Sequence, residues 1–131
     1  VGPGSLYTSL IPNLLVKDIM AAVSASRAMK MFVSNVATQR GETDGYSCLD
    51  HLEVIKKHIG KDLFDLVICN NYFEGDLGTF TDWVRPDNEL RKHYKVYEAR
   101  LVDEVNPWRH DSKTLAKTIM NLYEERTGPL I

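Results

Sequence analysis

The sequence predicts an α/β fold in which a parallel, doubly wound, Rossmann-like sheet carries helices on both faces. Two short apolar segments, MKMFVSN at 29–35 and LFDLVICN at 63–70, have the β-branched and aromatic content of strands in a covered sheet. Between them, residues 47–59 repeat apolar side chains at helical spacing. A strand, a helix and a strand in this order predict a right-handed parallel crossover.

The predicted helix at 47–59 has one apolar face and a clear end. The side chains that share this face are Cys48, Leu52, Ile55 and Ile59. Gly60 stands just past the last of them, where a left-handed glycine commonly ends a helix. His51 and His58 are two turns apart, too far for the i, i+4 pair of zinc ligands, so we expect both on the helix surface.

Two helices and a third strand flank this unit. Residues 8–15 and 18–28 precede it and predict helices, the second because Ala, Met and Ile dominate it. Residues 95–102 (KVYEARLV) follow it and alternate in the manner of a strand with one open face. We therefore expect three strands after Val1, within one domain.

The rest of the chain differs in regularity. Residues 72–93 combine glycines, prolines and many charges, so we expect an irregular excursion or flap there. Asp111 is expected to cap a last helix at 111–126, which Gly128-Pro129 ends. The apolar face of that helix comprises Leu115, Ile119, Leu122 and Tyr123.

Length and composition fit one domain with its own core. The chain has 131 residues, 26% of them charged, and a net charge of −2, so no polybasic surface indicates nucleic acid or an anionic membrane as partner. Cys48 and Cys69 lie in apolar stretches, which fits buried thiols in a reducing compartment. No charged-then-apolar leader stands at the N-terminus, and no apolar run approaches the roughly 20 residues of a membrane helix. We expect a cytoplasmic protein without a membrane span.

The opening stretch GPGSLYTS, within residues 1–9, is a candidate phosphate loop. Its glycines permit positive φ and close backbone approach, and the following helix directs free amides toward whatever lies before it. The candidate phosphate-binding residues are Gly2, Gly4, Ser5, Thr8 and Ser9. A tight turn capped by Ser5 is the alternative, which the pattern alone leaves open. Because such a loop normally leaves a parallel strand, we expect Val1 to end a strand that the sequence does not contain.

The loop NVATQRGETDGYS at 35–47 lies where the first predicted strand ends and a helix begins, the position at which open α/β sheets bind ligands. Its hydroxyl, amide and carboxylate groups can bind ligand hydroxyls or a base edge. The candidate crevice residues are Asn35, Thr38, Gln39, Glu42 and Thr43, with Asn70 at the end of the next strand. The alternatives are a polar surface loop in which Asp44 or Ser47 caps the helix, and a turn role for Asn70.

Spacing identifies no catalytic set. Neither cysteine lies beside a base, no G-x-S-x-G elbow exists, and the histidines lack metal-ligand spacing. His110 is a lesser candidate for ligand contact, and capping alone explains Asp111. The catalytic residues stay unassigned, and we name no metal ligand.

The motifs GPGSLYTSLIPNLLV and NVATQRGETDGYS, followed by Asp50-His51, the strand to Asn70 and Arg109-His110-Asp111, resemble the C-terminal part of the YvcK/CofD-like family. The resemblance covers most of the chain and is weakest over 72–93. Family members are more than about twice this length and begin with a glycine-rich strand, turn and helix. The resemblance therefore implies that the first half of a doubly wound domain precedes Val1.

The two branches of that family differ in function. The YvcK-like branch, called gluconeogenesis factors, binds nucleotide sugars such as UDP-N-acetylglucosamine and affects cell shape and carbon use, without an established reaction. The CofD branch is a magnesium-dependent transferase that moves 2-phospho-L-lactate from a guanosine diphosphate-type donor to a deazaflavin precursor. The run Leu6-Tyr7-Thr8 and the loop TQ-GETDGYS are similar to the first branch, so the resemblance favours binding over transfer.

By resemblance, the glycine loop would hold a diphosphate and the 35–47 loop would line the crevice for the sugar or an acceptor. Magnesium ligands of the transferase branch would lie outside this chain. We expect a UDP-sugar-binding regulatory protein, with a phospholactate transferase that uses Mg²⁺ as the alternative. A non-catalytic fragment that acts by association, for example as a homo-oligomer, is the second alternative, because an open half-sheet exposes an edge.

Overall fold

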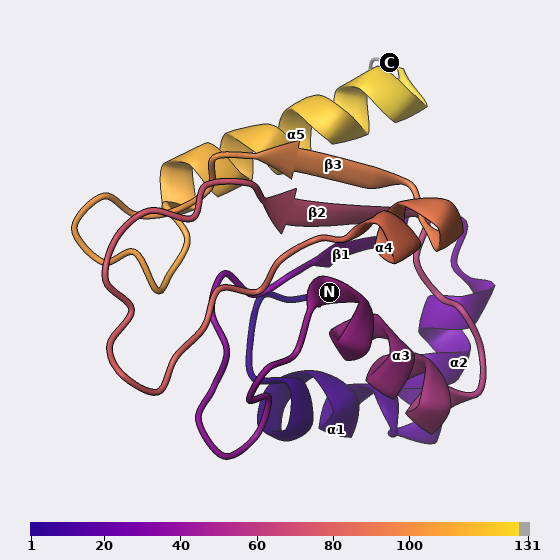
Figure 1. The fold of residues 1–131 in the computed structure, drawn as a ribbon. Coiled ribbons are helices and arrows are strands. Elements are labelled where there is room, and N and C mark those ends of the chain that lie inside the picture. Colours follow the sequence, from indigo (N-terminus) through magenta and orange to yellow (C-terminus); the bar gives the residue numbers. More distant parts are fainter. Residues whose placement is uncertain (129–131) are drawn as a thin grey trace.

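The computed structural model describes residues 1–128 and confirms the α/β fold. Three parallel strands form one open sheet in the order β1-β2-β3, with β1 at Met31–Val33, β2 at Leu66–Asn70 and β3 at Val96–Ala99 (Figure 1). Each strand is shorter than its predicted segment. The flanking residues leave the sheet to form the loops at its two ends.

The N-terminal helices start slightly earlier than predicted. A π-helical turn, η1 (Leu6–Leu10), runs into α1 (Ile11–Leu14), and α2 (Lys17–Ala25) follows. Pro12 lies in the first turn of α1, where its missing N–H leaves no bond unmade. Within residues 1–128, no single helix is long and apolar enough to cross a bilayer; Leu6–Leu14 and Lys17–Ala25 meet that test only as a pair, bent by 74°.

Helix α3 (Cys48–Ile59) has the ends that local sequence predicts. Ser47 accepts a hydrogen bond from the Asp50 N–H while the Asp50 carboxylate accepts from the Ser47 N–H, which forms a capping box. Gly60 ends the helix with φ of 79°.

The expectation that His51 lies on the helix surface is wrong, although His58 is exposed as predicted. His51 is 0% exposed because it lies three residues after Cys48 and four before Ile55, on the apolar face of α3. Its Nδ1 contacts the Ser47 carbonyl at 2.7 Å.

The segment 72–93 has no regular element as far as residue 87, apart from one isolated bridge at Trp83. Residues 82–84 run antiparallel to 36–38, with the Thr38 N–H donating to the Asp82 carbonyl and the Val84 N–H to the Val36 carbonyl, both at 2.9 Å. The segment then ends in helix α4 (Asn88–His93), whose cap Asp87 accepts from the Leu90 N–H at 2.7 Å.

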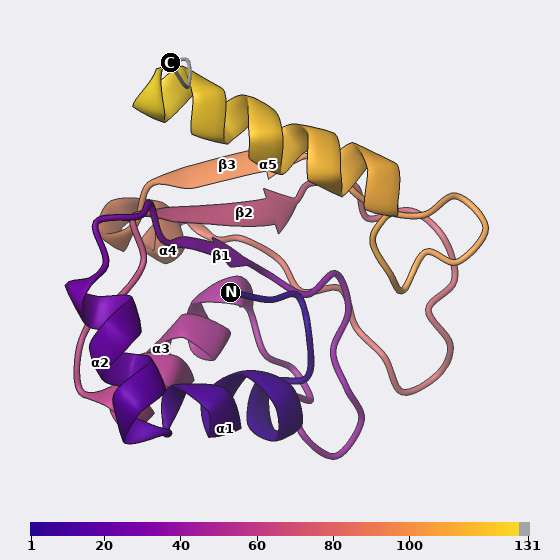
Figure 2. The ribbon, with the colours of Figure 1, turned by 180° about the vertical axis from the view of Figure 1, so that it is seen from behind.

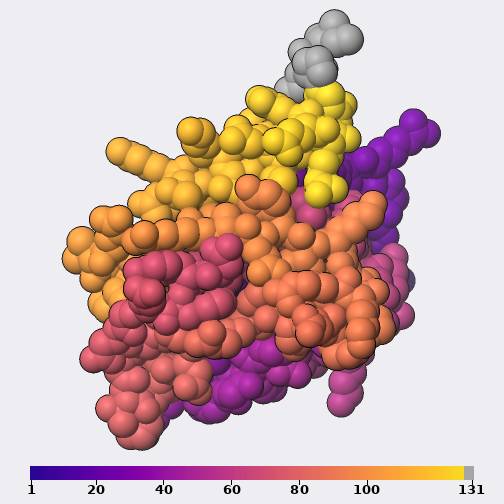
Figure 3. Space-filling model, turned by 45° about the horizontal axis from the view of Figure 1, so that its top comes forward, coloured from indigo at the N-terminus to yellow at the C-terminus, as the bar shows by residue number. Residues whose placement is uncertain are grey.

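Helices cover both faces of the sheet (Figures 1 and 2). Along β2, Leu66 and Ile68 pack in one cluster with α5 (Ser112–Thr127), while Val67 and Cys69 pack in the other with α1, α3 and α4. This alternation explains why the strand reads as a continuous apolar run. In the space-filling view of Figure 3, α5 (yellow) lies in contact with the orange segment that holds β3.

Helix α5 keeps most of its predicted features. Asp111 caps it by accepting from the Thr114 N–H at 2.7 Å, and Leu115 and Leu122 are buried. Gly128 follows the last helical residue as expected, while Pro129 lies outside the described residues.

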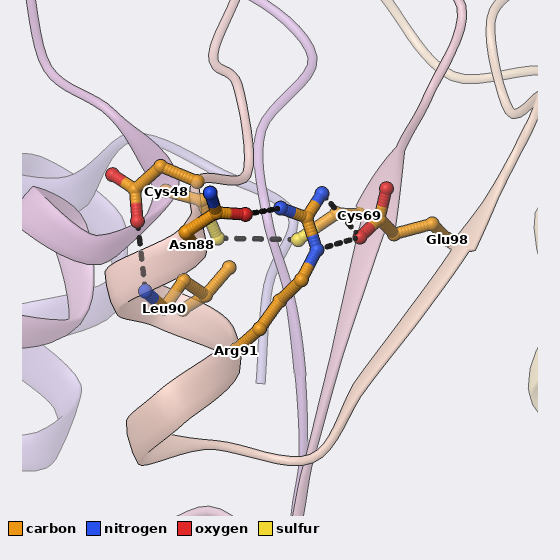
Figure 4. A network of polar contacts seen from close by, with 7 residues as sticks. Cys48, Cys69, Asn88, Leu90, Arg91 and Glu98 are labelled. Carbon is orange, nitrogen blue, oxygen red and sulfur yellow. Dashed lines mark hydrogen bonds and ion pairs between the residues drawn. The ribbon is translucent and has the colours of Figure 1, made fainter.

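The two cysteines meet in the core between α3 and β2. Their Sγ atoms are 3.2 Å apart, both side chains are buried, and both thiols are free (Figure 4). The contact with Cys48, together with burial, raises the pKa of Cys69 far above that of an ordinary thiol. Such thiols behave as small apolar side chains.

Val1 extends the hydrogen-bond ladder along the outer edge of β1. Its amino group donates to the Met31 carbonyl at 2.8 Å, and its carbonyl accepts from the Val33 N–H at 2.9 Å. The chain then turns at Gly2, whose φ is 79° and where an added Cβ would lie 2.5 Å from the Val33 oxygen. Gly2 therefore lets the loop leave this edge at the carboxyl end of β1.

Candidate functional site

A cleft of about 780 Å³ opens at the carboxyl edge of the sheet. Open α/β sheets bind ligands at this edge. Its walls come from four parts of the chain: the glycine loop, residues 35–39, the tip of the 72–93 segment, and the stretch from Trp108 into α5. Segments far apart in sequence thus enclose one volume large enough for a small-molecule ligand.

Asn35 fastens the glycine loop to the end of β1. Its Oδ1 accepts from the Gly4 N–H at 2.9 Å, and its Nδ2 donates to the Gly4 carbonyl at 2.8 Å. Both halves of the amide are therefore engaged with one residue. Asn35 lines the cleft and positions the backbone beside it.

Ser5 links the glycine loop to the 35–47 loop. Its hydroxyl donates to the Glu42 carboxylate at 3.0 Å and accepts from the Thr8 hydroxyl at 2.6 Å. Ser5 lines the cleft, whereas Thr8 and Glu42 are not part of its lining. Ser5 stands at the N-cap position of η1 without a capping side-chain bond, and the leading N–H groups of a helix lack intrahelical acceptors.

Thr38 and Gln39 form the next part of the wall. The Thr38 hydroxyl accepts from the Asp82 N–H at 2.9 Å, which leaves its proton free to donate. The Gln39 N–H donates to the Thr43 hydroxyl at 2.8 Å, and Thr43 is 1% exposed. Thr43 therefore supports the loop from inside while the exposed Gln39 side chain remains available.

The cleft brings together part of the predicted site. The predicted residues in its lining are Gly4, Ser5, Asn35, Thr38 and Gln39. Those outside the lining are Gly2, Thr8, Ser9, Glu42, Thr43 and Asn70.

Asn70 serves the fold at the end of β2. Its side chain is 1% exposed, its Oδ1 accepts from the Leu101 N–H at 3.1 Å, and its Nδ2 donates to the Tyr72 carbonyl. The two loops that leave β2 and β3 are joined through this amide. Asn70 thus has the turn role that its residue type allowed.

One wall was absent from the predicted binding residues. Trp108, Arg109 and Ser112 line the cleft, as does His110, which sequence analysis gave only a minor role. Trp108, Arg109 and His110 follow β3 and precede α5, and Ser112 is the first residue of that helix. They occupy the same strand-to-helix position as the 35–47 loop does after β1. Their place after a predicted strand could have identified them as candidates, because the carboxyl ends of parallel strands meet at one edge of the sheet.

Within residues 1–128, Arg109 is the one charged side chain in the lining at neutral pH. Arg109 contributes its guanidinium, 3.5 Å from the Asp103 carboxylate on the same loop. Burial lowers the pKa of His110 to about 4, although the hydrogen bond with the Ser34 backbone acts to raise this pKa. The ring is therefore neutral at pH 7. Its Nε2 is buried and has no hydrogen-bond partner among residues 1–128.

The lining does not suit Mg²⁺ by itself. Within residues 1–128 no carboxylate lines the cleft, and no group of three or more His, Cys, Asp or Glu side chains is placed to hold a metal ion. Magnesium is usually bound through one or two carboxylates and ligand phosphates. We assign no metal ligand in this chain.

Comparison with known proteins identifies relatives over nearly the whole chain. Residues 1–127 match the family model described as 2-phospho-L-lactate transferase CofD. The gluconeogenesis factor of Listeria monocytogenes is 47% identical over 135 residues, covering 98% of this chain and 42% of that protein. A relative from a Nostoc species is 55% identical over 134 residues, covering 94% of this chain and 29% of that protein.

A crystal structure of a UPF0052 family member from Bacillus halodurans has the same fold. It matches with a TM-score of 0.83 and 34% identity, covering 92% of this chain and 41% of that chain. The chain therefore spans less than half the length of these relatives. Since the family model matches almost every residue, the chain belongs to the CofD family, together with the gluconeogenesis factors that it resembles.

Proposed function

We propose that this chain provides a nucleotide-sugar-binding cleft in a cytoplasmic regulatory protein of the gluconeogenesis factor type, linked to carbon metabolism and cell shape. The cleft at the carboxyl edge of the sheet carries this proposal, because it joins a glycine loop, a cation and a polar loop in one volume. The name of the Listeria relative supports the class of protein.

In this proposal the diphosphate lies against the glycine loop. Gly4 permits close approach of a ligand to the backbone, and Arg109 offers a guanidinium suited to phosphate oxygens. The Ser5 proton, which the Glu42 carboxylate accepts in this structure, would turn to a phosphate oxygen when the diphosphate binds. Because Asn35 holds Gly4 through two hydrogen bonds, the loop is already ordered before a ligand arrives.

The sugar would lie against the 35–39 wall. The Thr38 hydroxyl can donate a proton, since its oxygen already accepts from the Asp82 N–H. The exposed Gln39 amide can both donate and accept. A hexose presents hydroxyl groups that these partners can bind.

A second candidate function is transfer of 2-phospho-L-lactate from a nucleoside diphosphate-type donor. The description of the matching family model favours it. Magnesium ligands would then come from residues beyond this chain, because its cleft lining offers no carboxylate within residues 1–128. Guanosine preference, magnesium dependence and turnover with a deazaflavin acceptor would distinguish this function from sugar-nucleotide binding.

A thermal-shift panel tests the proposal. The chain and the Listeria relative are heated with UDP-N-acetylglucosamine, UDP, GDP or NAD, with and without Mg²⁺. A ligand at 100 times its Kd adds about 2.7 kcal/mol to the free energy of unfolding, a rise in Tm of several degrees. We expect the uridine sugar to stabilise both proteins without Mg²⁺.

Two matched variants make the panel specific to the cleft. Ser5→Ala removes a hydroxyl from the lining, whereas Ser9→Ala removes an exposed hydroxyl outside it. We expect Ser5→Ala alone to reduce the ligand-induced shift. Failure of every uridine ligand to raise Tm at millimolar concentration would refute the proposal, and a guanosine response that requires Mg²⁺ would support the transferase.

A further inference from the structure

We propose that Trp108 is the wall of the cleft on which the nucleobase stacks, an inference that rests on the nucleotide-sugar function proposed above and assigns the base end of the site. Trp108 lines the cleft and is 54% exposed. An indole this open has a ring face available to a ligand, and bases stack well on aromatic side chains.

The loop that carries Trp108 is closed by its own hydrogen bonds. The Asp103 N–H donates to the Arg109 carbonyl at 2.9 Å, and the Arg109 N–H donates to the Asn106 carbonyl at 3.1 Å. The Asp103 carboxylate accepts from the N–H groups of Val105 and Asn106 at 2.9 and 2.7 Å. Because these bonds fix the backbone on both sides of Trp108, little loop entropy is lost when a ligand binds.

The residues at the two ends of the same loop are also paired with each other. Val102 and His110 form an antiparallel bridge at its base, and the Asp111 N–H donates to the Leu101 carbonyl at 2.7 Å. Trp108 therefore stands on a braced loop with its side chain half open.

The surroundings of Trp108 match the two chemical parts of a nucleotide. On the same C-terminal side of the chain, Leu115, Ala116 and Ile119 of α5 line the cleft with apolar groups, and Arg109, next to Trp108, adds the cation assigned to the diphosphate. Gly4 and Ser5 line a separate wall with polar groups. A flat base fits the apolar wall, and a diphosphate fits the polar one.

The binding experiment compares Trp108→Ala, Trp108→Phe and Val105→Ala by isothermal titration with UDP, UDP-N-acetylglucosamine and inorganic pyrophosphate. Val105 is the matched control, since it lies in the same loop, is 83% exposed and does not line the cleft. Loss of one base stack weakens binding by about 5- to 150-fold. We expect that loss for both uridine ligands in Trp108→Ala, substantial retention of affinity in Trp108→Phe, and unchanged pyrophosphate binding.

Fluorescence gives an independent readout. The chain has two tryptophans, and Trp83→Phe leaves Trp108 as the sole indole while keeping an aromatic ring beside Phe73. We expect UDP to change the emission of this variant and pyrophosphate to leave it unchanged. Stacking against a base is the reason for the difference.

Each contrary result has a distinct meaning. If the unsubstituted chain binds neither uridine ligand, the proposed function fails and the inference fails with it. If it binds both and Trp108→Ala binds them equally well, the inference alone is overturned. If Trp108→Ala loses affinity only for UDP-N-acetylglucosamine, the indole contacts the sugar. If it loses affinity equally for pyrophosphate, the indole supports the structure of the loop. Either result overturns base stacking.

Discussion

Mild acid should destabilise this chain because His110 is half-buried, with its Nε2 fully buried, and its ring is neutral in the folded state. Burial lowers the pKa of this ring from the usual 6.5 to about 4. The folded state therefore binds a proton less readily than the unfolded chain. The contribution of the neutral His110 ring to the free energy of unfolding is therefore complete above pH 6.5 and is lost as the pH falls toward 4.

The size of the loss follows from the two pKa values. Proton linkage between 6.5 and about 4 gives a decrease in the free energy of unfolding of about 2 kcal/mol by pH 5 and about 3 kcal/mol by pH 4. Burial also lowers the pKa of His51, so this fully buried histidine acts in the same direction. Staying above pH 5 excludes most carboxylate titration, since aspartates in unfolded chains titrate near 3.9.

Urea unfolding at pH 7.5, 6.5, 5.5 and 5.0 measures this effect. His110→Met removes the titrating ring. Between pH 7.5 and 5.0 its free energy of unfolding should therefore fall by about 2 kcal/mol less than that of the unsubstituted chain, whatever the stability of the variant at pH 7.5. His58→Gln, at an exposed position of α3, is the control and should leave the loss unchanged. Equal pH dependence in the unsubstituted chain and His110→Met would show that His110 is not the source of the acid sensitivity.

Three further predictions concern the fold. Gly2→Ala and Gly41→Ala both place alanine at a positive φ, but only the added Cβ at Gly2 would clash with a neighbour. We therefore expect Gly2→Ala to lower the free energy of unfolding by about 1–3 kcal/mol more than Gly41→Ala does, because of overpacking. Chemical denaturation compares the two variants, and equal stabilities would contradict the close approach at Gly2. Cys48 and Cys69 should react with a thiol reagent only after denaturation; rapid labelling of the folded chain would show that they are accessible. Asp111→Ala should cost about 1 kcal/mol through loss of the α5 cap, and an unchanged Tm would contradict that role.

Local sequence signals predicted the elements that depend on neighbouring residues. The ends of α3 at Ser47 and Gly60, and the start of α5 at Asp111, rest on hydrogen bonds and φ angles within a few residues. Helices on both faces of the sheet were predicted from the order of the strand and helix segments, without assigning each helix to a face. The helix ends could be predicted because a single stretch of chain determines each one.

Features that depend on distant contacts were missed. The backbone bonds between 36–38 and 82–84 join segments whose sequences carry no shared pattern, so the 72–93 segment read as irregular. His51 was misplaced because residue type outweighed its position on the apolar face of α3. Helical spacing alone would have indicated its burial.

The candidate site was predictable on one side only. The loops after Val1 and β1 combine glycines with polar residues, a familiar ligand-loop pattern, and both contribute to the cleft. The opposite wall contains Trp108 and the apolar side of α5, which in sequence resemble a loop and an ordinary core helix. Their role depends on how the sheet brings them beside the glycine loop.

Isothermal titration of the chain with UDP-N-acetylglucosamine measures whether the cleft binds a nucleotide sugar. We expect binding at one site without Mg²⁺, weakened by Ser5→Ala in the cleft and unaffected by Ser9→Ala outside it. Absence of binding at millimolar sugar nucleotide, or binding that both serine variants leave unchanged, would contradict this expectation.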